Sequence, residues 1–360
     1  MILKPDAISF GRYIARRAIN VPRNKSRFQL RTLATIAEKP AVHGSDSQVL
    51  FSYNDNKGEF KRTSLLEYFG ANGSPQSQNW PPSLKSGDFS SDETVAVGRL
   101  TDYIRRNGFA FITEVPVDSA EPTEKLLEKI AFIRQTHYGG FYDFIPDLAL
   151  ADTAYTNIAL AAHTDTTYFT DPAGLQAFHL LSHTDSSTEK HPGSNLGGQS
   201  LLVDGFHAAD VLRTEDPKAF DVLSKVRLPW HASGNKGITI SPDKPYPVLE
   251  VDESTGKIHR VRWNNDDRGV VPFDSKYSPI EWYEAARKWD GILRRKSMEY
   301  WFQLKPGTLL VFDNWRVLHG RSAFTGVRRI CGGYINRDDF VSRWRNTNYS
   351  RDEILERVIG

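Results

Sequence analysis

Apolar residues recur at helical spacing in several stretches of the chain, and residues typical of helix ends flank them. The predicted helices cover residues 94–108, 123–138, 217–226 and 278–302. Gly108 follows the first stretch as a C-terminal stop, and Thr123 is placed to cap the second. An Asp-Pro pair at 216–217 opens the third helix, and the SPIE capping box at 278–281 opens the fourth.

Short apolar runs bounded by Gly, Pro, Asn or Asp lie between these helices and predict strands. The runs cover residues 109–117, 174–181, 200–205, 308–313 and 329–335. Short strands of this kind favour a sandwich or jelly roll over a doubly wound parallel sheet. The sequence shows no glycine-rich phosphate loop and no dinucleotide-binding fingerprint. The predicted fold class is therefore mainly β with flanking helices.

Composition divides the chain into three parts. Residues 1–40 read as a basic leader, and residues 41–91 as a short N-terminal remnant and linker. From residue 70 that second part is rich in Gly, Ser, Pro and Asn, which is typical of a loop. Residues 92–350 carry the predicted helices and strands, so we expect them to form one domain.

The leader has the composition of a targeting segment. Residues 1–37 carry eight Lys and Arg against one Asp, with aromatic and aliphatic residues interleaved at helical spacing. Such a segment is typical of a mitochondrial transit peptide, although a basic tail without a targeting role has the same composition. The expected location is the mitochondrial matrix, with the cytoplasm as the alternative.

The remaining composition excludes several classes of function. Without residues 1–37 the chain has 38 Lys and Arg against 43 Asp and Glu and no basic stripe, so nucleic-acid binding is not expected. No apolar run approaches the roughly 18 residues that a membrane span requires. The single cysteine, Cys331, excludes an internal disulfide and a zinc site with two thiolates.

The tripeptide His-Thr-Asp occurs twice, at 163–165 and at 183–185. The second copy lies in a polar, turn-forming stretch, so we interpret His183 and Asp185 as surface residues. The first copy has apolar neighbours, and in an extended backbone His163 and Asp165 would face the same way. Such a pair could bind a divalent ion, and a buried, hydrogen-bonded His–Asp pair explains this stretch equally well.

A third candidate ligand, His319, follows the predicted strand 308–313. Two histidines and one carboxylate form the facial triad of non-haem Fe(II) oxygenases. Such enzymes use 2-oxoglutarate, whose distal carboxylate needs the forked guanidinium of an arginine. Arg328 and Arg329 lie on the next strand, where only one can face inward. Arg328 shares its parity with Tyr334 and is expected inside, whereas Arg329 is expected at the surface.

Five segments together resemble a known family: HTDTTYF, GGQSLLVDGF, RWNNDDRG, FDNWRVLHGR and CGGYINRDDF. In order and spacing, over residues 92–345, they are similar to the Fe(II)/2-oxoglutarate oxygenases of carnitine biosynthesis. The resemblance implies a double-stranded β-helix, which is a cupin-like jelly roll. It also implies that His163, Asp165 and His319 bind Fe(II), that Arg328 holds 2-oxoglutarate, and that ascorbate serves as reductant.

The reaction that the resemblance implies is hydroxylation of Nε-trimethyllysine at C3, with release of succinate and CO₂, as the first step of carnitine biosynthesis. A quaternary ammonium is recognised by aromatic rings through cation–π attraction. Tyr138, Tyr142, Tyr155 and Tyr334 match the positions where the family builds its aromatic cage. Each of them is alternatively a core tyrosine with a satisfied hydroxyl.

The other end of this substrate carries an ammonium and a carboxylate. Asp152 is placed to pair with the ammonium, and Asn264 or Asn265 to donate to the carboxylate. γ-Butyrobetaine, the substrate of a sibling enzyme, lacks the amine, and Asp152 would repel its bare carboxylate. Hydroxylation of γ-butyrobetaine is the alternative within the family. A non-catalytic jelly roll that binds a metal or ligand is the alternative of another class.

Two features depart from the family. Its members commonly carry an N-terminal module, which in the sibling hydroxylase binds zinc through cysteines, and Cys331 alone cannot form such a site. A homodimer is a possible assembly of this chain, but if that module supports dimerisation in the family, its shortened form here argues against one. Residues 184–197 resemble an insertion, and no function is assigned to them.

Overall fold

The computed structural model describes residues 80–145, 156–185, 196–234, 237–273 and 276–359. All of them belong to one unit of the chain, Gln48–Gly360. The leader expected at residues 1–40 lies outside the described residues, and so does the segment up to residue 79.

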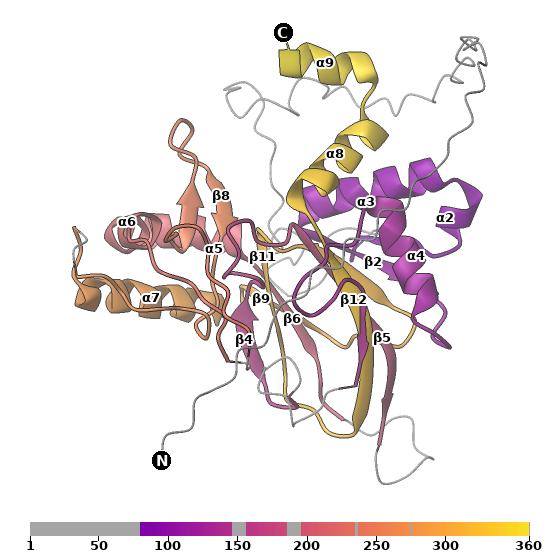
Figure 1. Ribbon diagram of the computed structural model, residues 1–360, viewed down its shortest axis with the longest axis horizontal. Helices are drawn as coiled ribbons and strands as arrows, with labels where there is room; N and C mark the ends of the chain where they lie inside the picture. The colour runs from indigo at the N-terminus through magenta and orange to yellow at the C-terminus, as the bar shows by residue number, and fades with distance from the viewer. Residues whose placement is uncertain (1–79, 146–155, 186–195, 235–236, 274–275, 360) are drawn as a thin grey trace, which may run out of the picture. The chain divides into compact units, whose positions relative to one another are not determined.

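Two sheets form the centre of the described structure (Figure 1). The six-stranded sheet has the order β1 (Ser83–Lys85), β2 (Phe109–Thr113), β10 (Leu309–Asp313), β5 (Leu175–Thr184), β12 (Val327–Ile335) and β3 (Tyr142–Phe144). The four-stranded sheet has the order β4 (Leu160–His163), β11 (Val317–Arg321), β6 (Ser200–Asp204) and β9 (Glu299–Phe302). Apart from β1 and β2, the paired strands of these two sheets are not consecutive in the sequence, and all pairs except β1–β2 are antiparallel. The predicted jelly roll is confirmed.

Alternation along the strands decides which side chains face the space between the sheets. On β10, Leu310 belongs to the apolar cluster between the sheets, whereas Val311 packs beneath the helices on the outer face. On β11, Val317 faces inward and Leu318 faces outward. His319, two residues after Val317, therefore points into the interior between the sheets.

Helices cover the outer face of each sheet, and the two groups lie on opposite sides of the sheets in Figure 1. The six-stranded sheet is covered by α3 (Glu93–Asn107), α4 (Glu121–Ile130) and α8 (Arg337–Asn348). The four-stranded sheet is covered by α5 (Gly205–Glu215), α6 (Pro217–Lys225) and α7 (Pro279–Leu293), beside the hairpin of β7 (Leu249–Val251) and β8 (Ile258–Val261). The described part also contains α2 (Asp88–Ser91) and α9 (Arg351–Ile359).

Three predicted helix ends are confirmed. Gly108 ends α3 in a left-handed conformation, with φ of 85°, and donates its N–H to the Ile104 carbonyl at 2.8 Å. The Asp216 carboxylate accepts from the Ala219 N–H at 2.9 Å at the start of α6. The capping box at 278–281 is present in both directions at the start of α7. Local polar chemistry therefore sets these ends.

Other predicted boundaries are wrong, and tertiary pairing explains the differences. Helix α4 begins at Glu121, so Thr123 lies inside it and its hydroxyl bonds to His179 Nδ1 at 2.6 Å instead of capping. Helix α4 ends at Ile130, and α7 ends at Leu293. Residues 299–302, expected in that last helix, form β9 and pair with β6.

Near the N-terminal edge of the six-stranded sheet, two further element boundaries differ from the predicted ones. Residues 83–91, expected in a linker, form β1 and α2, and β1 pairs with β2. The strand expected at 109–117 ends at Thr113, because Glu114 turns the chain with a φ of 61°. The fold built on the two sheets therefore begins before residue 92.

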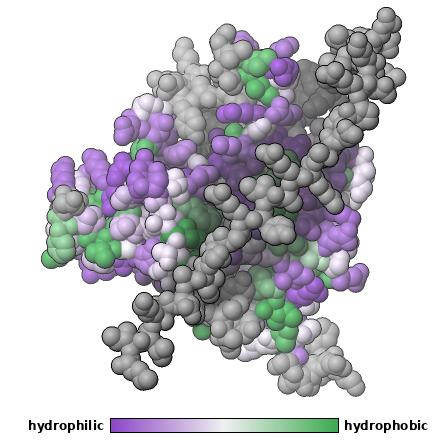
Figure 2. Space-filling view, viewed as in Figure 1, coloured by the Kyte–Doolittle hydropathy of each residue, from purple (hydrophilic) through white to green (hydrophobic). Residues whose placement is uncertain are grey.

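The described surface carries small apolar patches. On the face drawn in Figure 2, hydrophilic residues cover most of the described surface, and apolar residues form separate patches among them. Exposed apolar side chains such as Val95, Phe132 and Phe273 belong to different segments. None of the helices in the described ranges has the length and apolarity to span a membrane.

Candidate metal centre

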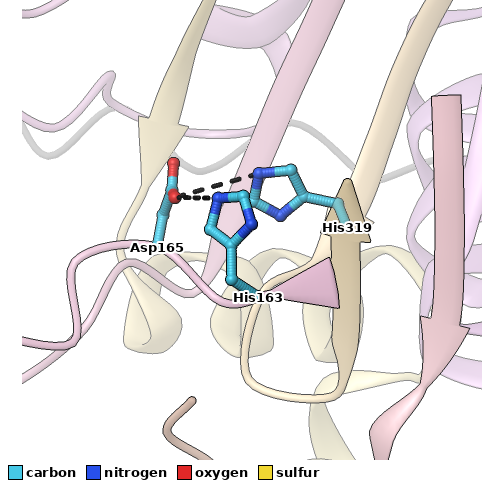
Figure 3. Close-up of side chains that lie close together, drawn as sticks. All are labelled: His163, Asp165 and His319. Atoms are coloured by element: carbon cyan, nitrogen blue, oxygen red, sulfur yellow. Dashed lines mark ion pairs between the residues drawn. The ribbon is translucent and has the colours of Figure 1, made fainter. Parts of the chain in front are cut away.

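His163, Asp165 and His319 meet at one edge of the four-stranded sheet (Figure 3). His163 is the last residue of β4 and stands opposite His319 of β11 in the strand register. One Asp165 oxygen, Oδ1, lies 3.3 Å from His163 Nε2 and 3.8 Å from His319 Nε2. One possible ligand atom from each residue lies within 4.8 Å of the others, and within the described ranges no second cluster of this kind occurs. The sequence prediction thus selected residues that the fold brings together.

Backbone pairing continues past the end of β4 and turns Asp165 toward the histidines. Thr164 donates its N–H to the Trp263 carbonyl at 2.8 Å, and its hydroxyl accepts from the Trp263 N–H at 3.0 Å. Thr164 thus points away, and His163 and Asp165 share the other side, as expected for extended backbone. The chain then turns at Thr166, whose φ is 58°.

The side chain of Asn314 holds the Asp165 backbone in place. Its Oδ1 accepts from the Asp165 N–H at 2.9 Å, and its Nδ2 donates to the carbonyls of Asp165 and Ala173, both at 3.0 Å. Asn314 is not among the predicted site residues, although it stands in the FDNWRVLHGR segment five positions before His319. An asparagine directly after a buried strand would have been the signal.

Hydrogen bonds and burial prepare these side chains to bind a cation. His163 Nδ1 donates to the Ala161 carbonyl at 2.8 Å, which leaves Nε2 directed at Asp165. Burial, together with His163, lowers the pKa of His319 to about 3, so this ring is neutral at neutral pH. Burial opposes ionisation of Asp165, but His319, His163 and Tyr334 outweigh it and lower the pKa of this carboxyl. The neutral imidazole of His319 and the carboxylate of Asp165 are ligands that suit a divalent transition metal.

The second copy of the tripeptide lies elsewhere. His183 and Thr184 end β5, so the prediction of a loop is wrong for these two residues. His183 is half-buried, its Nε2 bonds to the Thr325 carbonyl at 2.8 Å, and its ring meets the Phe324 ring edge to face. Its hydrogen bond to a backbone carbonyl gives it a structural role. Residues 186–195 lie outside the described residues.

A cavity of about 410 Å³ opens beside the three residues. The predicted residues that line it are Tyr138, Tyr142, Asn264, Arg328 and Tyr334. Of the two adjacent asparagines, Asn264 thus faces the cavity. Asn265 is exposed, and its Oδ1 accepts from Arg268 Nε at 3.3 Å. The prediction for Asp152 and Tyr155 falls outside the described residues.

Arg328 lies inside the protein as predicted, and Arg329 lies outside. The Arg329 guanidinium binds the Asp143 carboxylate through two hydrogen bonds, of 2.9 and 2.6 Å, at the surface. Arg328 is 5% exposed, and within the described part of the chain its Nε has no hydrogen-bond partner. Burial and the nearby Arg321 lower the pKa of Arg328 to about 9. A buried cation without an acidic partner is a candidate anion site.

Arg321 is a second buried arginine on the same wall, and sequence analysis assigned it no role. Its guanidinium donates to the carbonyls of Thr156 at 2.7 Å and Ile158 at 3.2 Å. Among the described residues its hydrogen-bond partners are these backbone carbonyls rather than a carboxylate, and burial lowers its pKa to about 10. Its position two residues after His319 was the available signal. The two arginines make this part of the cavity cationic.

Tyrosine rings form another part of the wall. The Tyr142 hydroxyl donates to the Ala177 carbonyl at 2.8 Å, and its ring lies edge to face with that of Tyr334, 6.0 Å between centroids. Gly332 allows this packing, because a Cβ there would lie 1.9 Å from the Ala177 oxygen and 2.9 Å from the Tyr142 hydroxyl. Tyr138 packs on His137 at 3.9 Å between ring centroids.

Comparisons with known proteins place this geometry in a family. Residues 72–334 match the model of the taurine catabolism dioxygenase TauD, TfdA family. Trimethyllysine dioxygenase of Neurospora crassa is 66% identical over 293 residues, which cover 75% of this chain and 62% of that protein. Mitochondrial trimethyllysine dioxygenase of Bos taurus is 43% identical over 247 residues, covering 66% of this chain and 54% of that protein. The chain thus spans about 62% of the length of the first of these relatives.

Solved structures agree at the level of the fold. The structure of PvcB, an Fe, alpha-ketoglutarate dependent oxygenase from an isonitrile synthetic pathway, superimposes with a TM-score of 0.50 at 16% identity. The match covers 71% of this chain and 82% of PvcB. Because the family model extends over most of the chain and over both sheets, this chain belongs to the taurine catabolism dioxygenase TauD, TfdA family.

Proposed function

We propose that this chain is an Fe(II)- and 2-oxoglutarate-dependent oxygenase that hydroxylates Nε-trimethyllysine at C3. The products would be the hydroxylated amino acid, succinate and CO₂, in the first step of carnitine biosynthesis. The observation that carries the proposal is the cluster of His163, Asp165 and His319 on a cavity that also contains the buried Arg328, for which the described residues provide no acidic partner. Relatives at 66% and 43% identity that are named trimethyllysine dioxygenase support the choice of substrate.

The donor set fits Fe(II). His163 and His319 would each provide Nε2, and Asp165 would provide Oδ1, which is the oxygen that faces both rings. Two imidazoles and one carboxylate are the protein ligands of non-haem iron oxygenases. When bound with 2-oxoglutarate and O₂, the iron supplies the oxidising power for inserting one oxygen atom into a C–H bond. Ascorbate would keep the iron reduced.

Arg328 would hold the distal carboxylate of 2-oxoglutarate. Its guanidinium is desolvated by burial, has no acidic partner in the described residues, and lies on the same cavity as the histidines. A buried guanidinium binds a carboxylate strongly through paired hydrogen bonds. Arg321 would add a second positive charge near this end of the co-substrate.

The aromatic wall would receive the trimethylammonium group. The hydroxyls of Tyr142 and Tyr334 are engaged by Ala177 and Asp165, so these residues offer their rings to the cavity. A methylated ammonium binds ring faces because it cannot form hydrogen bonds. Tyr138 lines the same cavity, and Tyr155 belongs to the proposal although it lies outside the described residues.

Polar groups would fix the amino-acid end of the substrate. Asn264 accepts from the Asp266 N–H through its Oδ1, which leaves its amide N–H groups for the substrate carboxylate. Asp152, which lies outside the described residues, would pair with the α-ammonium. A substrate held at both ends presents one carbon to the metal, so orientation selects C3.

Localisation and assembly are part of the proposal. Bovine, mouse and human relatives are named mitochondrial, and the basic composition of residues 1–37 agrees with import into the matrix. A homodimer would be consistent with this proposal, and gel filtration of the full chain with light scattering measures it.

The test offers trimethyllysine and γ-butyrobetaine in parallel to the full chain with Fe(II), ascorbate and 2-oxoglutarate. Mass spectrometry follows the addition of one oxygen atom, and succinate is measured in the same samples. Oxygen added to trimethyllysine alone supports the proposal. Product from γ-butyrobetaine alone would keep the chemistry and overturn the substrate, and product from neither would indicate a binding protein.

A further inference from the structure

One oxygen of Asp165 is held by two hydrogen-bond donors, and the other faces the histidines. Gln176 Nε2 donates to Asp165 Oδ2 at 2.6 Å, and the Tyr334 hydroxyl donates to the same oxygen at 2.8 Å. Oδ1 is the oxygen that lies 3.3 and 3.8 Å from the two imidazoles. Gln176 is 1% exposed and Tyr334 is 5% exposed, so little water competes for Oδ2.

The fold places the two donors side by side. Tyr334 of β12 and Gln176 of β5 are direct register partners in the six-stranded sheet, so their side chains project from the same face. Phe312 of β10 is the partner of Gln176 on its other side, and its ring lies 5.0 Å from that of His319. Three adjacent strands thus present one row of side chains to the ligands, which come from the opposite sheet and the loop after it.

Chemistry fixes the direction of both hydrogen bonds. An ionised carboxylate only accepts, so the amide of Gln176 must present its nitrogen and Tyr334 must present its hydroxyl hydrogen. This orientation leaves Gln176 Oε1 buried without a partner among the described residues. A buried acceptor without a partner costs free energy, so Gln176 is not explained by packing alone. The arrangement therefore favours a specific role for Gln176 as a donor to Asp165.

We infer that Gln176 and Tyr334 are positioning residues that hold Asp165 so that it offers a single oxygen to the metal. The inference rests on the proposed function for the identity of the metal. A carboxylate with both oxygens free can bind a metal through one or both of them. With Oδ2 engaged by Gln176 and Tyr334, Asp165 would offer only Oδ1 to the metal.

Tyr334 also connects the metal centre with the substrate wall. Its hydroxyl holds Asp165, while its ring lines the cavity beside Tyr142. Removing the hydroxyl alone should therefore weaken the metal site and leave the aromatic wall nearly complete. This separation gives the experiment a readout that a general loss of structure would not produce.

The experiment uses the full chain with Tyr334→Phe, Gln176→Met and, as the matched control, Tyr142→Phe. The control removes a tyrosine hydroxyl from the same wall, but its partner is the Ala177 carbonyl. Binding of Mn(II), a stand-in for Fe(II), is measured by the electron paramagnetic resonance signal of the free ion. Thermal unfolding of each variant verifies that it is folded.

We expect Tyr334→Phe and Gln176→Met each to weaken Mn(II) binding about 10–100-fold, which is typical of losing an outer partner of a metal ligand. Tyr142→Phe should bind Mn(II) like the unmodified chain. With saturating Fe(II), Tyr334→Phe should keep the KM for trimethyllysine within about 2-fold, because a cation–π contact depends on the ring.

Equal Mn(II) affinity of all three variants would overturn the inference. If Gln176→Met fails to fold, Tyr334→Phe decides alone, because it keeps the ring. Mn(II) binding is measured without substrate, so weakened binding in a chain that does not hydroxylate trimethyllysine would support the inference and reject the proposed function. If the unmodified chain hydroxylates trimethyllysine but the variants bind Mn(II) with unchanged affinity, the proposed function is supported and the inference about Gln176 and Tyr334 is rejected. An unmodified chain that binds no Mn(II) would reject the inference and the proposed function together.

Discussion

Arg328 and Arg329 are adjacent in the sequence, yet their charges lie in different environments. Arg328 is buried beside the cavity, whereas Arg329 pairs with Asp143 at the surface. Arg328→Met should raise the KM for 2-oxoglutarate by at least about 100-fold, because each charge-assisted hydrogen bond to the carboxylate contributes roughly 1.5–3 kcal/mol. Succinate release at varied 2-oxoglutarate measures the effect.

Arg329→Met is the control for that change. It removes a surface ion pair, which contributes only about 0–1 kcal/mol to stability, and it should leave the KM for 2-oxoglutarate unchanged. An equal rise in KM for both variants would show that Arg328 is not the specific anchor.

Gly332 is needed where β5, β12 and the Tyr142 side chain meet. Gly332→Ala would place a Cβ 1.9 Å from the Ala177 oxygen, so β12 must shift away from β5. We expect a loss of about 2–4 kcal/mol in the free energy of unfolding, as for other cases of overpacking and lost strand hydrogen bonds. Urea unfolding followed by circular dichroism measures this loss.

Gly291→Ala on α7 is the matched change, because nothing lies within 4 Å of its added Cβ. It should be neutral or stabilise the chain by up to about 1 kcal/mol through helix propensity. A loss of stability at Gly291 as large as that at Gly332 would contradict the account of the β5–β12 contact.

At the scale of elements, a buried ion pair joins segments of both layers. Arg316, in the turn between β10 and β11, donates to both oxygens of Asp204, at 3.2 and 2.6 Å. Asp204 ends β6 and caps α5, and Arg316 also donates to the Arg106 carbonyl at the end of α3. Because both side chains are almost fully buried, losing one partner would leave an uncompensated charge.

Asp204→Asn should therefore lower the free energy of unfolding at neutral pH by about 3–5 kcal/mol. Asp290→Asn, which removes only a surface pair between Asp290 of α7 and Arg294 just after this helix, should change it by about 1 kcal/mol or less. Denaturant unfolding of both variants gives the two values. Equal losses would mean that the buried pair does not join the elements as described.

The same ion pair contributes to the dependence of stability on pH. Burial opposes ionisation of Asp204, but Arg316 outweighs it, so the folded-state pKa of this carboxyl lies below its ordinary value of 3.8. A carboxyl with a lowered folded-state pKa contributes stability above its unfolded pKa and loses it as pH falls through the folded value. Unfolding from neutral pH to below 3.8 should show a weaker acid dependence for Asp204→Asn than for the unmodified chain.

At the scale of the whole molecule, the sequence predicts features that depend on neighbours along the chain. The helix ends at Gly108, Asp216 and Ser278 follow from local capping chemistry, and the strands at 174–181 and 308–313 follow from apolar runs. The helices predicted at 123–138 and 278–302 extend too far, by residues 131–138 and 294–302, because helical spacing alone does not reveal pairing with a distant strand. Residues 299–302 pair with β6, about one hundred positions earlier.

The residues of the candidate site also divide into those that a local motif predicts and those that depend on distant segments. His163, Asp165, His319 and Arg328 stand in short motifs, so parity and family resemblance were sufficient to select them. Gln176 has no local signature, and the position of Asn314 after a strand does not indicate its partner, because each acts on Asp165 across the interior. Their contribution becomes visible only when the strand register brings distant segments together.

Comparing the two copies of the His-Thr-Asp tripeptide in the full chain tests the assignment of the metal centre most directly. His163→Ala and His183→Ala are measured for Mn(II) binding and for succinate release with trimethyllysine. His163→Ala should lose more than about 100-fold in metal affinity, beyond the 10–100-fold typical of outer partners, and should release almost no succinate. His183→Ala, which breaks a hydrogen bond to the Thr325 carbonyl, should keep both. Equal losses in the two variants, or a larger loss in His183→Ala, would contradict the assignment of the metal centre.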